Sequence, residues 1–212
     1  MSRSANIQAF LKAAGWDMAQ RGPLAGDAGN RKYERLNRPQ KGAAILMDAD
    51  PASGEDIRPF LNIAAHLKSC DLSAPEIYDA DCDLGLILLE DFGDQLLFDV
   101  ANTTPDLEYP LYKMCLEALT QLHQTPPPLN VESYFPHEMA QAAEITLAWY
   151  CSPDLGATIA AELVKQLGNL DWTRPVLVLR DYHAQNVVYR PEQSGLAQIG
   201  LLDFQDAQLG HP

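Results

Sequence analysis

Three oxygen-bearing side chains near the end of the sequence have the types and the spacing that phosphoryl transfer requires. Asp181 and Asn186 lie five positions apart in a polar segment between two short apolar runs, and Asp203 directly follows another apolar run. One carboxylate can accept the proton of an attacking hydroxyl, while an amide and a second carboxylate can hold Mg²⁺ against nucleotide phosphates. We therefore predict Asp181 as the catalytic base and Asn186 and Asp203 as metal ligands.

The spacing of these residues also matches a known pattern. The interval from Asp181 to Asn186 is that of the protein kinase catalytic loop, and Asp203-Phe204 matches the first two residues of the kinase metal-binding tripeptide. With residues 89–94 (Leu-Glu-Asp-Phe-Gly-Asp) in the place of an interlobe hinge, the sequence resembles the aminoglycoside phosphotransferase and choline kinase superfamily. The resemblance implies that ATP binds between two lobes, with its adenine at the backbone of Glu90, Asp91 and Phe92.

Within that superfamily, four segments are most similar to bacterial N-acetylmuramate and N-acetylglucosamine anomeric kinases. They are residues 45–48, 58–60, the hinge at 89–94, and 203–207, the last reading Asp-Phe-Gln-Asp-Ala. The resemblance implies transfer of the gamma-phosphoryl of Mg-ATP to a hydroxyl of a small molecule, most simply a sugar or amino sugar. An aminoglycoside or choline-like kinase, a non-catalytic nucleotide-binding pseudokinase, and a metal-dependent hydrolase with His183 as a ligand stay open as alternatives.

Two positions depart from the superfamily pattern. Leu179 stands where the catalytic loop usually begins with a structural His, and Met47 stands about where a third-strand Lys would contact the ATP phosphates. Gly26 and Gly29 lie in a predicted hairpin, where they would let backbone amides approach those phosphates. The cation that neutralises the phosphates is left unassigned among four neighbouring basic residues: Arg31, Lys32, Arg35 and Lys41.

Three further polar residues carry open interpretations. His183 is either a brace of the catalytic loop or, in the hydrolase alternative, a ligand. Asp206 either supports the metal site or is a solvated carboxylate. Glu55 is either the acid that pairs with a phosphate-binding base or a residue favoured by the dipole of a helix N-terminus.

The surrounding patterns predict an α+β, protein-kinase-like fold with two lobes. Residues 1–90 would form an N-lobe with an N-terminal helix, capped by Ser4 and ended by Gly15, an antiparallel sheet, and a second helix beginning near residues 53–56. Residues 91–212 would form a mainly helical C-lobe, incomplete because superfamily members continue beyond Pro212. We expect strands within residues 24–36, 43–47, 76–79, 84–89, 175–179, 186–189 and 199–202, and helices at 104–122, 139–150 and 158–167.

The overall composition limits the classes of function. The formal net charge of −14 argues against non-specific nucleic-acid binding, and no run of about 18 apolar residues is present to cross a membrane. The four cysteines are widely spaced, which favours reduced structural thiols, and the first residues lack the apolar stretch of a secretory signal. We expect a cytoplasmic enzyme whose partner is a small-molecule hydroxyl acceptor, and we leave the oligomeric state open.

Overall fold

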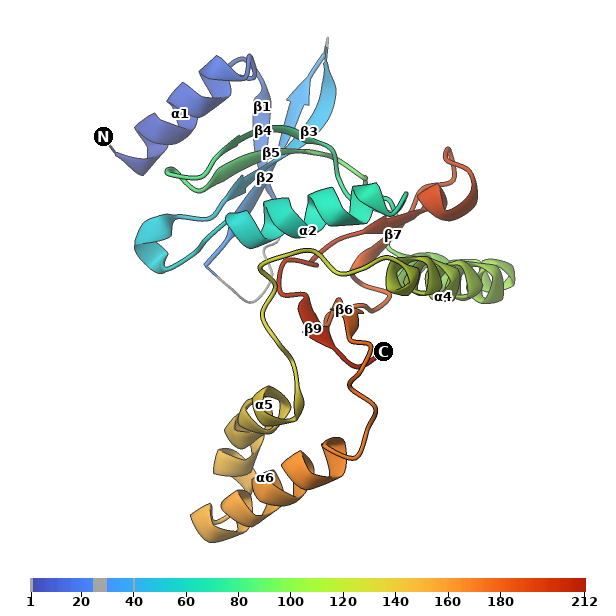
Figure 1. Cartoon of the computed structure of the whole chain (residues 1–212). Coiled ribbons are helices and arrows are strands. Elements are labelled where there is room, and N and C mark those ends of the chain that lie inside the picture. Colours follow the sequence, from blue (N-terminus) through green and yellow to red (C-terminus); the bar gives the residue numbers. More distant parts are fainter. Residues whose placement is uncertain (1, 25–29, 40) are drawn as a thin grey trace.

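The computed structural model describes residues 2–24, 30–39 and 41–212 and has two lobes (Figure 1). A twisted sheet with helices forms the N-lobe, and helices with two small strand pairs form the C-lobe. The predicted fold class is confirmed. Within the described ranges, no helix is both long and apolar enough to cross a membrane.

The N-lobe sheet contains five strands in the order β1-β2-β3-β5-β4, and every neighbouring pair is antiparallel. These strands include each N-lobe segment that the sequence patterns predicted. Their bounds are β1 (Gln20–Leu24), β2 (Lys32–Arg38), β3 (Gly42–Asp48), β4 (Ile77–Asp81) and β5 (Leu86–Glu90).

Both faces of this sheet are covered, which explains why β5 is a continuous apolar run. Leu86 and Leu88 face α1 (Arg3–Ala13), whereas Ile87 and Leu89 face α2 (Arg58–Ser69), as side chains alternate along a strand. The α1 side forms its own apolar cluster with Leu36, Ala44 and Leu46. The α2 side faces the C-lobe and therefore forms the roof of any interlobe cleft.

The two N-lobe helices begin at different residues from those predicted. Ser2, not Ser4, caps α1, because its hydroxyl accepts a hydrogen bond from the amide of Ala5; Gly15 follows the helix with a φ of 71°, as expected. The second helix begins at Arg58 because Pro51–Ser53 form a separate 3₁₀ turn that ends at Gly54 with a φ of 87°. The left-handed glycine interrupts the helix that the sequence favoured from residues 53–56.

The C-lobe contains the predicted helices and strands and two additional elements. Neither α3 (Leu97–Thr103) nor β9 (Gln208–Gly210) was predicted, and both are short. The helix expected from residue 104 begins with a 3₁₀ turn at Pro105–Leu107 before α4 proper. The other elements are α4 (Glu108–Gln124), α5 (Pro136–Tyr150), α6 (Pro153–Leu167), β6 (Val176–Val178), β7 (Val187–Tyr189) and β8 (Ile199–Leu201), with antiparallel pairs β6·β9 and β7·β8.

One apolar core joins the two lobes. It contains residues of β3, β5 and α2 from above and of α4, β6, β7 and β8 from below. The α5–α6 pair extends away from this core (Figure 1), and Ala140 is the buried residue that the structure describes in the two helices. The apolar residues of both lobes therefore form one packed core next to the segments that contain Asp181, Asn186 and Asp203.

Candidate active site

The predicted catalytic loop lies between β6 and β7 and is held at both ends. Leu179 is buried in the shared core, so the residue that replaces the usual His serves as an apolar anchor. The Tyr182 hydroxyl donates to the carbonyl of Cys115 on α4 at 3.0 Å, and burial raises the pKa of that hydroxyl. The amide of Asn186 donates to the carbonyl of His183 at 2.8 Å, which closes the loop.

The structure brings the three residues predicted to act together into one cluster. The side-chain amide of Asn186 donates to the Asp203 carboxylate at 3.2 Å and to the backbone carbonyl of Asp181 at 3.0 Å. The amide of Leu202 donates to the carbonyl of Asn186 at 3.0 Å, which fixes the loop against the segment that carries Asp203. The Asp181 carboxylate is exposed, so an acceptor molecule can approach it.

Backbone strain occurs at this cluster. Asp203 has a φ of 54°, and Arg180, the residue before Asp181, has a φ of 63°. Non-glycine residues rarely adopt such angles, and the cost of about 1–3 kcal/mol is tolerated mainly where the surroundings fix the conformation. Gln205, which is buried, supplies part of that restraint by donating to Asp203 at 2.6 Å. Gln205 was not among the predicted site residues, and its position between Asp203 and Asp206 was the available signal.

The donor chemistry of the cluster fits magnesium. Asp203 and Asn186 offer carboxylate and amide oxygens, which are the hard ligands that Mg²⁺ prefers. Among the residues that the structure describes, no group of three or more His, Cys, Asp or Glu side chains gathers as a complete metal cage. Mg²⁺ commonly binds through one or two protein ligands together with substrate phosphates and water, so two protein ligands are sufficient.

His183 lies beside the cluster as a brace of the loop. Its Nδ1 accepts from the backbone amide of Gln185 at 3.3 Å, and its Nε2 lies 3.3 Å from the side-chain amide of Asn186. Both ring nitrogens thus face the loop itself. This arrangement favours the bracing interpretation over the metal-ligand role that the hydrolase alternative needs.

The hinge residues lie between the lobes, but their side chains are used for structural contacts. The Asp91 carboxylate forms an ion pair with Arg35 at 2.6 Å, and the Glu90 carboxylate forms one with Arg190 at 2.7 Å. The Phe92 ring lies under the Arg190 guanidinium, 4.0 Å from ring centre to guanidinium carbon. These side chains are thus not free to bind an adenine, and adenine binding by the hinge backbone stays a prediction. Arg190 itself was missed by the sequence analysis.

The predicted phosphate-binding positions are only partly described. Gly26 and Gly29 lie outside the described residues, so their nucleotide role stays a prediction. Met47 is almost fully buried in the shared core. Of the basic candidates, Arg31 forms a 2.8 Å ion pair with Glu55, which gives that acid a partner that the sequence did not identify.

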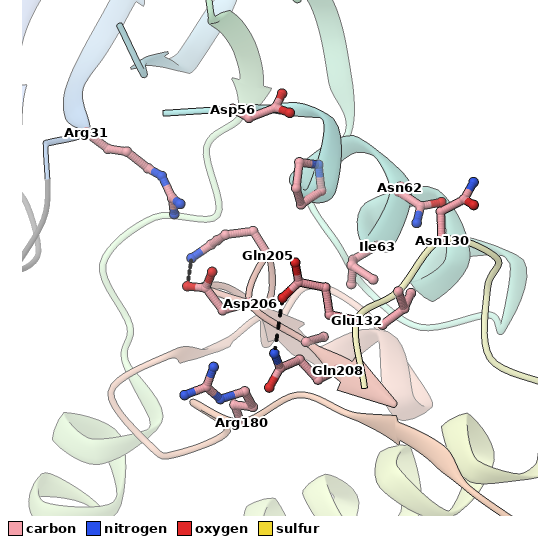
Figure 2. Close-up of a pocket in the computed structure, with 13 residues that line it drawn as sticks. Arg31, Asp56, Asn62, Ile63, Asn130, Glu132, Arg180, Gln205, Asp206 and Gln208 are labelled. Atoms are coloured by element: carbon pink, nitrogen blue, oxygen red, sulfur yellow. Dashed lines mark hydrogen bonds between the residues drawn. The ribbon is translucent and has the colours of Figure 1, made fainter. Parts of the chain in front are cut away.

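A cavity of about 310 Å³ opens beside the cluster. Figure 2 shows Arg31 reaching into it from the N-lobe, with Gln205 and Asp206 below and Arg180 on the opposite side. The first turns of α2 form another wall of the cavity. It therefore lies where the N-lobe, the predicted metal-binding segment at residues 203–207 and the residue before Asp181 meet.

The two lobes, the hinge and the clustered acids define a kinase-like phosphotransferase. The sequence pattern of the phosphotransferase enzyme family matches residues 21–212, and the chain belongs to that family. Two bacterial relatives are N-acetylmuramate/N-acetylglucosamine kinases. The protein of Caulobacter vibrioides is 32% identical, with 99% of this chain and 69% of the relative covered, and that of Pseudomonas putida is 30% identical, with 92% and 58% covered. The chain is thus one of the small-molecule kinases and spans about three fifths to two thirds of these relatives.

Solved structures share the fold at low sequence identity. The choline kinase of Streptococcus pneumoniae superposes with a TM-score of 0.67 at 14% identity, covering all of this chain and 72% of that one. A ternary complex of streptomycin, ATP and APH(2'')-IIa superposes with a TM-score of 0.63 at 13% identity, covering 99% and 71%. These likenesses support the fold and leave the substrate to other arguments.

Proposed function

We propose that this protein transfers the gamma-phosphoryl group of Mg-ATP to a hydroxyl of an amino sugar. The observation that carries the proposal is the cluster of Asp181, Asn186 and Asp203 at the floor of the interlobe cleft. Sugar kinases among the relatives at 30–32% identity favour an amino sugar over an aminoglycoside or a choline-like acceptor.

The roles of the residues follow from their positions. Asn186 and Asp203 would hold Mg²⁺, which would neutralise charge on the phosphates. Asp181 has its carboxylate exposed at the edge of the loop, where it can orient an incoming hydroxyl and accept its proton. Since phosphoryl transfer asks mainly for positioning and charge stabilisation, the rigid loop contributes by fixing these groups relative to one another.

The test is ADP release with a panel of acceptors. The panel contains N-acetylglucosamine, N-acetylmuramate, an aminoglycoside and choline, and it is run on this chain and on any longer form. We expect turnover with an amino sugar, and we expect Asp181→Asn to lower it about a hundred- to ten-thousand-fold, the usual contribution of a general base. The affinity for Mg-ATP should stay unchanged in that variant.

Two outcomes would contradict the proposal. Nucleotide binding with no ADP release by any form would instead support the pseudokinase alternative, for which the departures at Met47 and Leu179 are the reason. Equal turnover in the parent and in Asp181→Asn would remove Asp181 from the mechanism.

A further inference from the structure

Kinases place a lysine on the third strand, where it contacts the nucleotide phosphates and pairs with a glutamate of the helix behind it. In this chain β3 carries Met47 at that position, and the thioether is almost fully buried against α2. A methionine cannot neutralise phosphate charge. The cation must therefore come from another element, or the site has none.

Arg31, directly before the neighbouring strand β2, places a guanidinium on the same side of the sheet as Met47. Tyr33 of β2 lies directly opposite Met47 in the ladder, and both contact the core on the cleft side. Arg31 lies directly before the first residue of β2, and its side chain lines the cavity on this side of the sheet. Figure 2 shows its side chain extending into the cavity toward Asp206.

Arg31 is also held in place by an acid at the start of the α2 region. Its Nε donates to the Glu55 carboxylate at 2.8 Å, and the two side chains are only 23% and 17% exposed. A guanidinium has five N–H donors, and this bond uses one of them. The ion pair thus fixes one edge of the guanidinium while its size leaves donors for a second anionic group.

Electrostatic effects at Tyr33 connect this pair with the predicted metal ligand. Burial raises the pKa of the Tyr33 hydroxyl, the positive charge of Arg31 opposes that rise, and the negative charge of Asp203 adds to it. The charges of Arg31 and Asp203 therefore both act on the Tyr33 hydroxyl. Arg31 also lines the same cavity as Gln205 and Asp206, which follow Asp203 by two and three residues.

The other three basic candidates are placed differently. Arg35 is engaged by Asp91 and Asp94 at the hinge, and Lys41 lies over the Trp16 ring, on the α1 side of the sheet. Lys32, the first residue of β2, is exposed and alternates with Tyr33 along the strand, so it faces away from the cleft.

We propose that Arg31, positioned by Glu55, binds the ATP phosphates in place of the third-strand lysine. The inference rests on the proposed function, because it requires that the cleft bind Mg-ATP. It assigns to the Arg31–Glu55 pair the role that a lysine–glutamate pair has in kinases. The cation would then lie directly before β2 and not on β3. Glu55 is then a positioning residue, since it acts through Arg31.

The test compares the affinities for Mg-ATP and for adenosine, measured by calorimetry on the whole chain. Arg31→Gln keeps a hydrogen-bond donor for Glu55 but removes the charge, so it should fold and bind Mg-ATP about 10- to 100-fold more weakly, as expected for a lost charge-assisted hydrogen bond. Its affinity for adenosine should stay within about twofold of the parent. Arg31→Lys should recover part of the loss.

Arg21→Gln is the matched control, because Arg21 also forms an ion pair across the sheet, with Glu34 at 2.6 Å, but on the α1 side. It should leave both affinities unchanged. Unchanged Mg-ATP affinity in Arg31→Gln, or an equal loss for ATP and adenosine, would overturn the inference while leaving the proposed function in place. A parent chain that binds no Mg-ATP would overturn the proposed function and this inference together.

Discussion

At the scale of single residues, Asp203 has the most constrained environment in the site. Its backbone is left-handed, one carboxylate oxygen accepts from Asn186, and the other accepts from Gln205. Amide donors on both oxygens fix the direction of the carboxylate. The orientation of the Asp203 carboxylate is thus fixed by the protein itself, without a bound nucleotide.

Replacing Asp203 should separate metal-dependent from metal-independent binding. Asp203→Ala removes a predicted Mg²⁺ ligand, so we expect weaker binding of ATP when Mg²⁺ is present and little change when it is absent. A titration of ATP with and without Mg²⁺ measures this difference. Asp206→Asn, an exposed neighbour, serves as the comparison and should have the smaller effect. Equal Mg²⁺ dependence in Asp203→Ala and in the parent would count against the metal assignment.

Sequence spacing was sufficient to locate Asp181, Asn186 and Asp203 in one cluster. Short strands flank a short loop there, so local geometry brings the residues together. The partner of Glu55 could not be found in the same way. Arg31 precedes β2 and Glu55 precedes α2, 24 positions further along the chain, so their contact depends on tertiary packing.

At the scale of elements, α2 packs an aromatic side chain against the predicted metal-binding segment at residues 203–207. Phe60 of α2 stacks on Phe204, with ring centres 4.8 Å apart and an angle of 29° between the planes. Phe204 follows Asp203 directly and is almost fully buried. A shift of the helix would therefore move the predicted metal ligand.

Truncating this contact should affect both stability and nucleotide binding. Phe204→Ala leaves a cavity in the shared core, and we expect a loss of about 3–5 kcal/mol in the free energy of unfolding. Because the ring supports Asp203, the affinity for Mg-ATP should also fall, whereas Phe204→Leu should retain most of both properties. Urea unfolding and ATP titration measure the two effects. A fully stable Phe204→Ala variant would contradict this account of the packing.

The same helix carries a histidine that should make stability depend on pH. Burial lowers the pKa of His66, which lies on the buried side of α2 with its Nε2 3.6 Å from the Cys70 sulfur. The unfolded chain therefore binds a proton more readily than the folded chain, so stability is lost as the pH falls below about 6.5. Burial lowers the pKa of His123 as well.

Thermal unfolding between pH 7.5 and 5 tests this prediction. His66→Gln should flatten part of the fall in melting temperature toward acid pH, and the remainder should come from His123. The exposed His137 of α5 is the control, and His137→Gln should leave the profile unchanged. Identical profiles for His66→Gln and the parent would exclude His66 as a source of the pH dependence.

Element types were predictable where the apolar periodicity is long, and boundaries were not. The continuous apolar run of β5 and the apolar stripe of α2 are strong signals, because β5 is buried on both faces and α2 buries one face. The short α3 and β9 carry too few residues for a period to appear. The start of α2 depends on the left-handed Gly54, which no periodicity reports.

At the scale of the whole molecule, the lobes are joined by one core and by charged contacts at the hinge. The division into residues 1–90 and 91–212 stays a prediction, since apolar packing continues across it. Arg190, which follows β7, contacts the N-lobe and the hinge: it forms a 2.7 Å ion pair with Glu90, donates to the Ser73 hydroxyl at 2.8 Å, and lies over the Phe92 ring. Gly200 allows this arrangement, because a Cβ there would come within 2.7 Å of Phe92.

Arg190 should therefore control both the stability of the lobe contact and the geometry of the predicted adenine site at the hinge. Arg190→Ala leaves the Glu90 carboxylate, which is 26% exposed, without this partner and removes the cation from the Phe92 ring. We expect a loss of about 2–3 kcal/mol in the free energy of unfolding, between the values for exposed and buried ion pairs with a cation–π contribution added. Adenosine affinity should fall with it, because the backbone of the hinge loses its support.

This response differs from that of Arg31→Gln, which should weaken ATP binding and spare adenosine. Arg190→Lys keeps the charge but loses the planar stacking, so an intermediate result in urea unfolding and calorimetry is expected. Parent-like adenosine affinity in a destabilised Arg190→Ala variant would show that the hinge geometry does not depend on this residue.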